Sequence, residues 1–181
     1  MNTENIERYL NSFGRNVVKE SRALLREQKG DTRLAKSIRY EVFKTANGFS
    51  TNFYMFDYGE YLDEGVSGNK QQRYYTNFKG KKELSSYKYT NKQPPPDVLS
   101  RWIKRKGIQP KGLGRGRDKN TGQFISNLAF LIGKKIKREG IKSLSFFQKP
   151  LGLGYNKLQK ELLKEVKADI ESYITTFFRP K

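Results

Sequence analysis

Four carboxylates lie close together in residues 57–68, which read DYGEYLDEGVSG: Asp57, Glu60, Asp63 and Glu64. The whole chain carries only 18 Asp and Glu against 37 Lys and Arg, so this density of acids is unusual. Carboxylate oxygens bind divalent cations, and with a positioned lysine they can serve a nuclease. The stretch lacks the spacing of a calcium loop, however, and on a strand Asp57 and Glu60 would point to opposite faces. We therefore interpret the acids as a solvated strand end and turn.

Other catalytic groups are scarce in this chain. It contains no histidine and no cysteine, so the commonest general base, the commonest metal ligand and all thiol chemistry are missing. The segment GLGRGR at 112–117 does not match a nucleotide-binding loop, because no Gly-Lys-Ser/Thr follows it. We interpret it as a basic loop. The sequence predicts that the protein is not an enzyme and uses no cofactor and no metal.

Positive charge is the strongest chemical signal. The net charge of +19 predicts an anionic partner, either nucleic acid or an acidic protein surface. One basic group occupies residues 101–119, opposed only by Asp118: Arg101, Lys104, Arg105, Lys106, Lys111, Arg115, Arg117 and Lys119. A second group follows: Lys134, Lys135, Lys137 and Arg138. Trp102 lies in the first group, as in nucleic-acid grooves, but its helical spacing with Val98, Leu99 and Ile103 favours the core.

Hydrophobic periodicity predicts the elements that carry these residues. Apolar residues at three- and four-residue steps predict helices at 4–28, 97–106, 123–139 and 156–176. Alternating and aromatic segments predict two strands, at 38–43 and 49–58, joined by an Asn-Gly turn. Residues 67–93 fit either short strands or an excursion loop, and 143–154 fit a final strand or extended crossover.

This order of elements predicts an α+β fold, in which a small antiparallel sheet packs against the N- and C-terminal helices. A helical pair is inserted, and the single domain divides into 1–66, 67–143 and 144–181. The longest apolar run, residues 128–132, is far shorter than the roughly 20 residues that span a bilayer, so no membrane association is expected. The polar start of the chain is unlike a secretory leader.

Five segments, in order, resemble the tail-completion (head–tail joining, or neck) proteins of tailed bacteriophages. They are DTRLAKSI (31–38), YGEYLDEGV (58–66), WIKRKGI (102–108), LAFLIGKKI (128–136) and SFFQKPL (145–151). The family pattern has Thr-Gly where this chain has Asp31-Thr32, Gly-Thr where it has Gly65-Val66, and Pro-Phe where it has Ser145-Phe146. The segment 67–93 matches nothing in that pattern.

The resemblance implies a structural virion protein, made in the host cytoplasm and placed in the neck. It would form a homo-oligomeric ring between a portal or adaptor protein and a tail tube or tail terminator protein, leaving a channel with weak, non-specific DNA contacts. A ring of identical subunits joins two different faces of the same chain. We expect the interface residues to be Asp63, Glu64, Gly65, Arg101, Lys104, Arg105, Arg115 and Arg117. Anionic contacts are expected at Lys111, Lys119, Lys134, Lys135, Lys137 and Arg138, and the alternative function is a free-standing nucleic-acid-binding protein.

Overall fold

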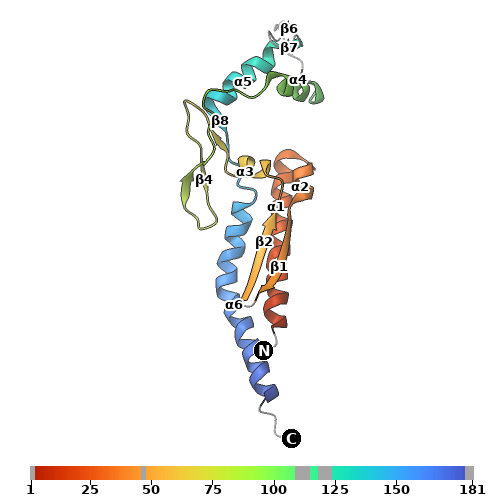
Figure 1. Ribbon diagram of the computed structural model, residues 1–181, viewed down its shortest axis with the longest axis vertical. Helices are drawn as coiled ribbons and strands as arrows, with labels where there is room; N and C mark the ends of the chain where they lie inside the picture. Colours follow the sequence, from red (N-terminus) through yellow and green to blue (C-terminus); the bar gives the residue numbers. More distant parts are fainter. Residues whose placement is uncertain (1–2, 46–47, 109–114, 118–123, 178–181) are drawn as a thin grey trace. The chain divides into compact units, whose positions relative to one another are not determined.

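The computed structural model describes residues 3–45, 48–108, 115–117 and 124–177. Helices and small antiparallel sheets make up these residues (Figure 1), so the predicted α+β class is confirmed. The chain divides into two compact units. The first comprises Met1–Asp63, Thr76–Glu83 and Leu144–Lys181, and the second comprises Glu64–Tyr75 and Leu84–Ser143. None of the described helices combines the length and the apolar character needed to cross a bilayer.

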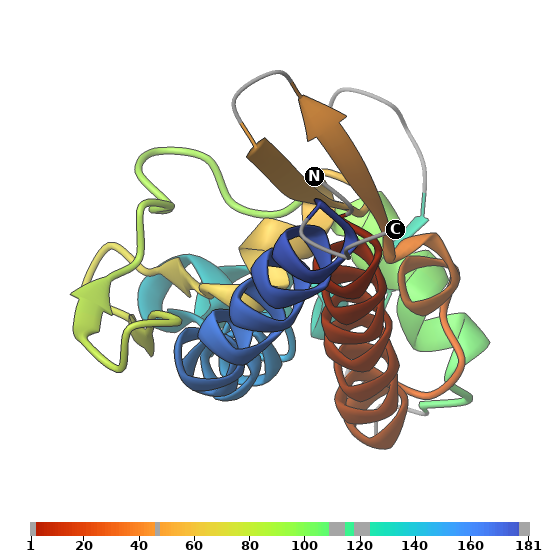
Figure 2. The same ribbon diagram turned by 90° about the horizontal axis from the view of Figure 1, so that it is seen from below.

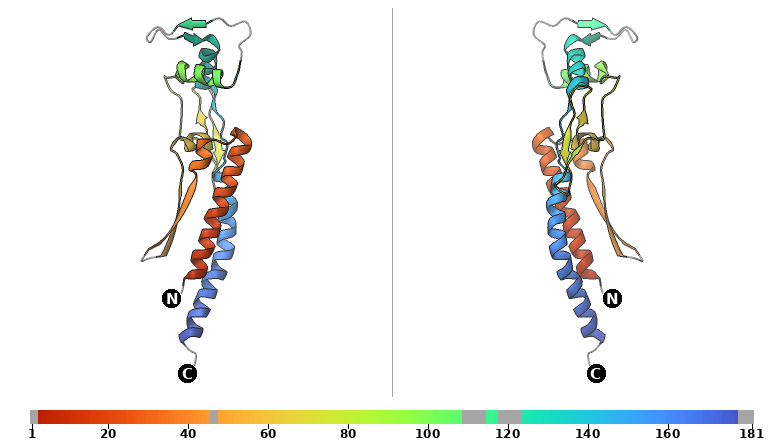
Figure 3. Two further views of the ribbon diagram at one scale, coloured as in Figure 1. Left: turned by 90° about the vertical axis from the view of Figure 1, so that its right-hand side faces the viewer. Right: turned by 90° about the vertical axis from the view of Figure 1, so that its left-hand side faces the viewer.

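Two long helices dominate the first unit, α1 (Glu4–Lys29) and α6 (Gln148–Phe177). They run side by side in opposite directions, as Figures 1 and 3 show, and Figure 2 views them nearly end-on. The strands β1 (Arg39–Thr45) and β2 (Gly48–Tyr54) form an antiparallel hairpin beside α1, with Arg39 opposite Tyr54. The short helix α2 (Arg33–Ser37) connects α1 to this hairpin.

The local sequence explains why α1 begins and ends where it does. Glu4 and Glu7 lie in its first turn and Arg26 and Lys29 in its last, which matches the sign of the helix dipole at each end. Gly30 follows at φ 79° and donates its N–H to the Arg26 carbonyl at 2.7 Å. The predicted helix at 4–28 is therefore confirmed.

The core of the first unit lies where α1, α2 and the start of α6 meet. Six buried residues from these elements and the residues beside them form one cluster: Val18, Leu25, Leu34, Ala35, Ile38 and Phe146. Gly14 extends this contact along α1, because a Cβ atom there would lie 2.2 Å from the Tyr40 ring on β1. The absence of a side chain at Gly14 thus allows the hairpin to approach the helix closely.

The second unit is built from α4 (Pro96–Arg105), α5 (Asn127–Glu139) and short strands. In this unit β3 (Val66–Ser67) pairs with β8 (Gly140–Ile141), and β6 (Arg115–Arg117) pairs with β7 (Phe124–Ser126), both antiparallel. Helices α4 and α5 pack together, with Leu99 against Gly133. Strands β4 (Tyr74–Thr76) and β5 (Lys82–Leu84) pair in a hairpin. Residues 67–93 therefore contain short strands, which is one of the two structures predicted for them. The units divide at 63/64 and 143/144, and the hairpin tip, Thr76–Glu83, belongs to the first unit.

Three predicted element boundaries are wrong. Strand β2 ends at Tyr54, and the helix α3 (Tyr58–Asp63) replaces the expected strand end and turn. Residues 148–154, expected to be extended, are the first two turns of α6, where Pro150 lies in the first turn and removes no helical hydrogen bond. The inserted helix α5 begins at Asn127, because 124–126 form β7.

Candidate interaction surfaces

The side chain of Asp63 is an internal helix cap. It is 2% exposed, and its carboxylate accepts the backbone N–H groups of Phe147 at 2.7 Å and Gln148 at 3.2 Å. These donors belong to the start of α6, whose first N–H groups have no partner within the helix. The interpretation of Asp63 as a solvated acid is therefore wrong, because its carboxylate binds N–H groups of the same chain. Its place at a subunit interface stays a prediction.

The acids that the structure does expose in this stretch are Asp57 and Glu60. Aromatic side chains surround them in sequence and are also exposed: Phe56, Tyr58 and Tyr61 are 48%, 45% and 45% accessible. The Phe56 and Tyr58 rings stack, with centroids 5.7 Å apart and planes 19° apart. We call these five residues the acidic aromatic patch. No three side chains of His, Cys, Asp or Glu gather to hold a metal ion among the residues described.

The expected turn residues Glu64 and Gly65 lie in the second unit. Gly65 has φ 79°, as expected for a sharp turn, and a Cβ there would lie 2.7 Å from both the Ile141 carbonyl oxygen and the Ser143 nitrogen. Because Gly65 has no side chain, β3 can pair closely with β8. Glu64 is half-buried, and its Oε2 atom is buried without a hydrogen-bond partner among the described residues.

Helix α4 exposes three residues of the first basic group. Arg101 donates to Asp97 at 2.9 Å one turn earlier, while Lys104 and Arg105 are exposed near the helix end. Trp102 is 38% exposed, so the expectation that it belongs to the core is wrong, and Ile103, at 4%, is the core residue of this helix. An exposed indole among cations is a surface that can bind anions or aromatic groups.

Helix α5 carries three of the four residues of the second basic group on a continuous exposed stripe. Its buried or half-buried face includes Ala129, Ile132 and Gly133, and its exposed residues recur at helical spacing on the other side. They are Asn127, Phe130, Leu131, Lys134, Lys135 and Arg138. We call these six residues the basic apolar stripe. Lys137 is outside it, because its Nζ atom donates to the Asn91 carbonyl at 2.7 Å.

The remaining predicted cations belong to the segment between α4 and α5. Arg115 and Arg117 lie on β6, opposite Ser126 and Phe124 of β7. Lys111 and Lys119 lie outside the described residues. The proposed anionic contacts at these four positions stay predictions.

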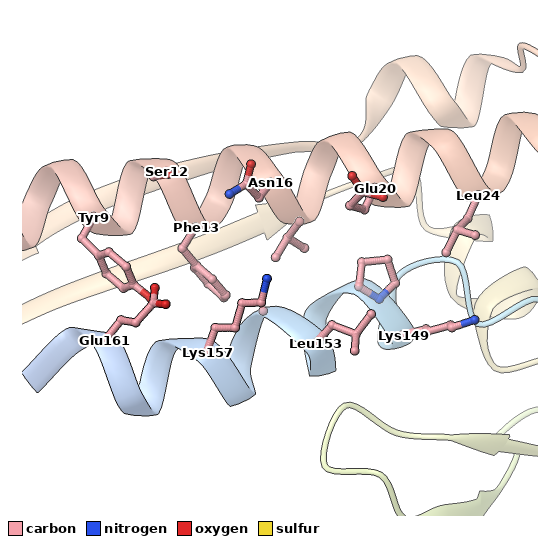
Figure 4. Close-up of a pocket in the computed structure, with 13 residues that line it drawn as sticks. Tyr9, Ser12, Phe13, Asn16, Glu20, Leu24, Lys149, Leu153, Lys157 and Glu161 are labelled. Atoms are coloured by element: carbon pink, nitrogen blue, oxygen red, sulfur yellow. The ribbon is translucent and has the colours of Figure 1, made fainter.

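A groove between α1 and α6 was not predicted from the sequence. Figure 4 shows Tyr9, Phe13 and Leu24 on α1 facing Leu153, Lys157 and Glu161 on α6, around a cavity of about 470 Å³. Tyr9 donates its hydroxyl to Glu161 at 3.1 Å, and burial, reinforced by that carboxylate, raises the pKa of Tyr9 to about 12. The groove was missed because residues 148–154, which supply Leu153, were expected to be extended.

The far end of the same helix pair holds a second buried aspartate. Asp169 of α6 is 1% exposed and accepts the Asn5 side-chain amide at 2.7 Å and the Ile6 backbone N–H at 3.2 Å. It caps the start of α1, as Asp63 caps the start of α6. Both capping residues are far in sequence from the N–H groups they bind, so no local motif marks them.

Comparison with known proteins gives no relative: the chain matches no family model, no curated protein and no solved structure.

Proposed function

We propose that the protein is a structural subunit in the neck of a tailed bacteriophage, where copies of the chain assemble into a ring between the portal side and the tail. The proposal combines the five-segment resemblance with one structural observation, the exposure of large apolar side chains along several helices. On α6, Leu153 and Leu163 are 62% and 72% exposed, and Ile170, one heptad after Leu163, is 41% exposed. Single exposed apolar residues are ordinary, but two on one helix face, as Leu163 and Ile170 are, favour a protein–protein surface.

The second unit supports the same proposal. On α4 and α5, Val98, Trp102, Phe130 and Leu131 are each between 38% and 49% exposed, next to exposed cations. Burying such side chains in an assembly contributes roughly 25 cal/mol for each Å² of apolar surface removed from water. The function proposed is mechanical and requires no reaction.

The direct test is to locate the protein in an intact particle by electron cryomicroscopy and to measure the mass of the purified chain in solution. We expect density for several copies at the neck and discrete closed oligomers, with only weak binding to free DNA. A purified chain that stays a single subunit and is absent from particle necks would overturn the proposal.

The exposure of Trp102 favours a second candidate, a free-standing nucleic-acid-binding protein. The indole lies on α4 with exposed Lys104, Arg105 and Lys106, and aromatic residues among cations can stack on bases. This function predicts tight DNA binding that weakens steeply with salt, and a lower affinity for DNA after Trp102→Ala. The neck proposal expects neither result.

A further inference from the structure

We infer that the acidic aromatic patch of one copy docks on the basic apolar stripe of a second copy. The inference rests on the proposed self-association and names the two faces that make it. Both faces are described completely, and each lies within one compact unit: the patch on and just before α3, the stripe on α5 (Figure 1).

The two surfaces have matching apolar parts. The patch presents three aromatic rings that are 45–48% exposed, two of them already stacked on each other. The stripe presents Phe130 and Leu131, which are 49% and 48% exposed on adjacent positions of α5. Aromatic side chains are enriched at the centres of protein interfaces, where they bury large areas at low entropic cost.

The charged parts are opposite in sign. The patch carries Asp57 and Glu60, and the stripe carries Lys134, Lys135 and Arg138 one and two turns after its apolar residues. Arg138 is held by Glu139 at 2.5 Å, but no salt bridge within the described part of the chain involves Lys134 or Lys135. Opposite charges around an apolar centre fix the orientation of a contact and exclude like-charged partners.

Charge complementarity also indicates that the molecule bound by these two faces is a second copy of the chain. DNA would be repelled by the patch, which concentrates acids in a chain of net charge +19. A second copy supplies both the aromatic groups and the acids that the stripe lacks. Because the two faces differ, the contact is heterologous, and repeating it closes a ring if the rotation between copies permits.

The experiment exchanges charge between the faces. One variant reverses the patch (Asp57→Lys with Glu60→Lys) and another reverses the stripe (Lys134→Glu with Lys135→Glu). We expect each variant alone to self-associate at least about tenfold more weakly than the native chain in sedimentation velocity, because each then presents like charges to itself. An equimolar mixture of the two should restore association, at least to pairs and alternating oligomers, since a contact between the two different variants again joins opposite charges.

The mixture separates a contact between copies from one within a chain. A chain that carries all four substitutions should also assemble, and association of that chain with no association at all in the mixture would overturn the inference. Native-like assembly of either variant alone would also overturn it while leaving the proposed neck function intact. The matched control is Lys79→Glu with Lys81→Glu, two exposed lysines at the tip of the β4–β5 hairpin, which changes the net charge as the stripe variant does and should assemble like the native chain. A native chain that never assembles, in solution or in the particle, refutes the proposed function itself.

Discussion

At the level of single residues, two buried aspartates organise the first unit. Asp63 binds the N–H groups of Phe147 and Gln148, and Asp169 binds Asn5 and Ile6. Each side chain satisfies donors that the start of a long helix leaves without partners. Because both carboxylates are nearly inaccessible, their role is to fix where α6 and α1 begin.

Replacing Asp63 by alanine should destabilise the protein. The change leaves two half-buried N–H groups without an acceptor, so we expect the free energy of unfolding to fall by about 1–3 kcal/mol. Asp63→Asn keeps one acceptor oxygen, so its free energy of unfolding should lie between those of Asp63→Ala and the native chain. Urea denaturation measures both. Glu60→Gln, at an exposed position on the same helix, should change stability by less than about 0.5 kcal/mol, and equal stability of Asp63→Ala and the native chain would contradict the capping role.

At the level of elements, the close approach of α1 to β1 depends on Gly14. Alanine is normally the better helix former by about 1 kcal/mol, so Gly14→Ala would stabilise an isolated helix. Here the added methyl would overlap the Tyr40 ring, and we expect a net loss of about 1–3 kcal/mol in thermal denaturation. In a Tyr40→Ala background the same substitution should cost less or become stabilising. A stabilising effect in the native background would show that α1 and β1 are not in contact there.

The pairing of α1 with α6 should respond to alkaline pH through Tyr9. The pKa of Tyr9 is raised from 10.0 to about 12 in the folded chain, so the unfolded chain loses this proton first. The contribution of the protonated Tyr9 hydroxyl to the free energy of unfolding is fully present below pH 10 and is lost as the pH rises toward 12. Tyr9→Phe should therefore lose less stability than the native chain between these pH values. Tyrosinate absorbance, compared between the two proteins, measures the pKa directly, and an ordinary value would contradict burial beside Glu161.

At the level of the whole molecule, the two units have unequal cores. The first holds a cluster of six buried residues, while the part of the second that the structure describes buries few apolar side chains, among them Val66, Ile103 and Ala129. The single tryptophan, Trp102, reports on the second unit, whereas the helical circular-dichroism signal comes mainly from the 26 residues of α1 and the 30 of α6.

We expect urea to unfold the second unit first, so tryptophan fluorescence should change before circular dichroism. Ile103→Ala should shift mainly the fluorescence transition and Leu25→Ala mainly the circular-dichroism transition, each by about 2–5 kcal/mol. Coincident transitions that both substitutions shift together would show that the chain unfolds as one cooperative unit.

The sequence by itself determined the α+β class and the positions of α1 and α4, because apolar spacing, terminal charges and a proline or glycine at the ends act over one or two helical turns. It also determined that the surface carries a large excess of positive charge. Only the tertiary structure decided that Asp63 is a cap and that Trp102 is exposed. It likewise moved the start of α6 from residue 156 to Gln148. The hydrogen bonds that Asp63 accepts from Phe147 and Gln148 span 84 and 85 residues, and no local pattern encodes a contact between parts so distant in the chain.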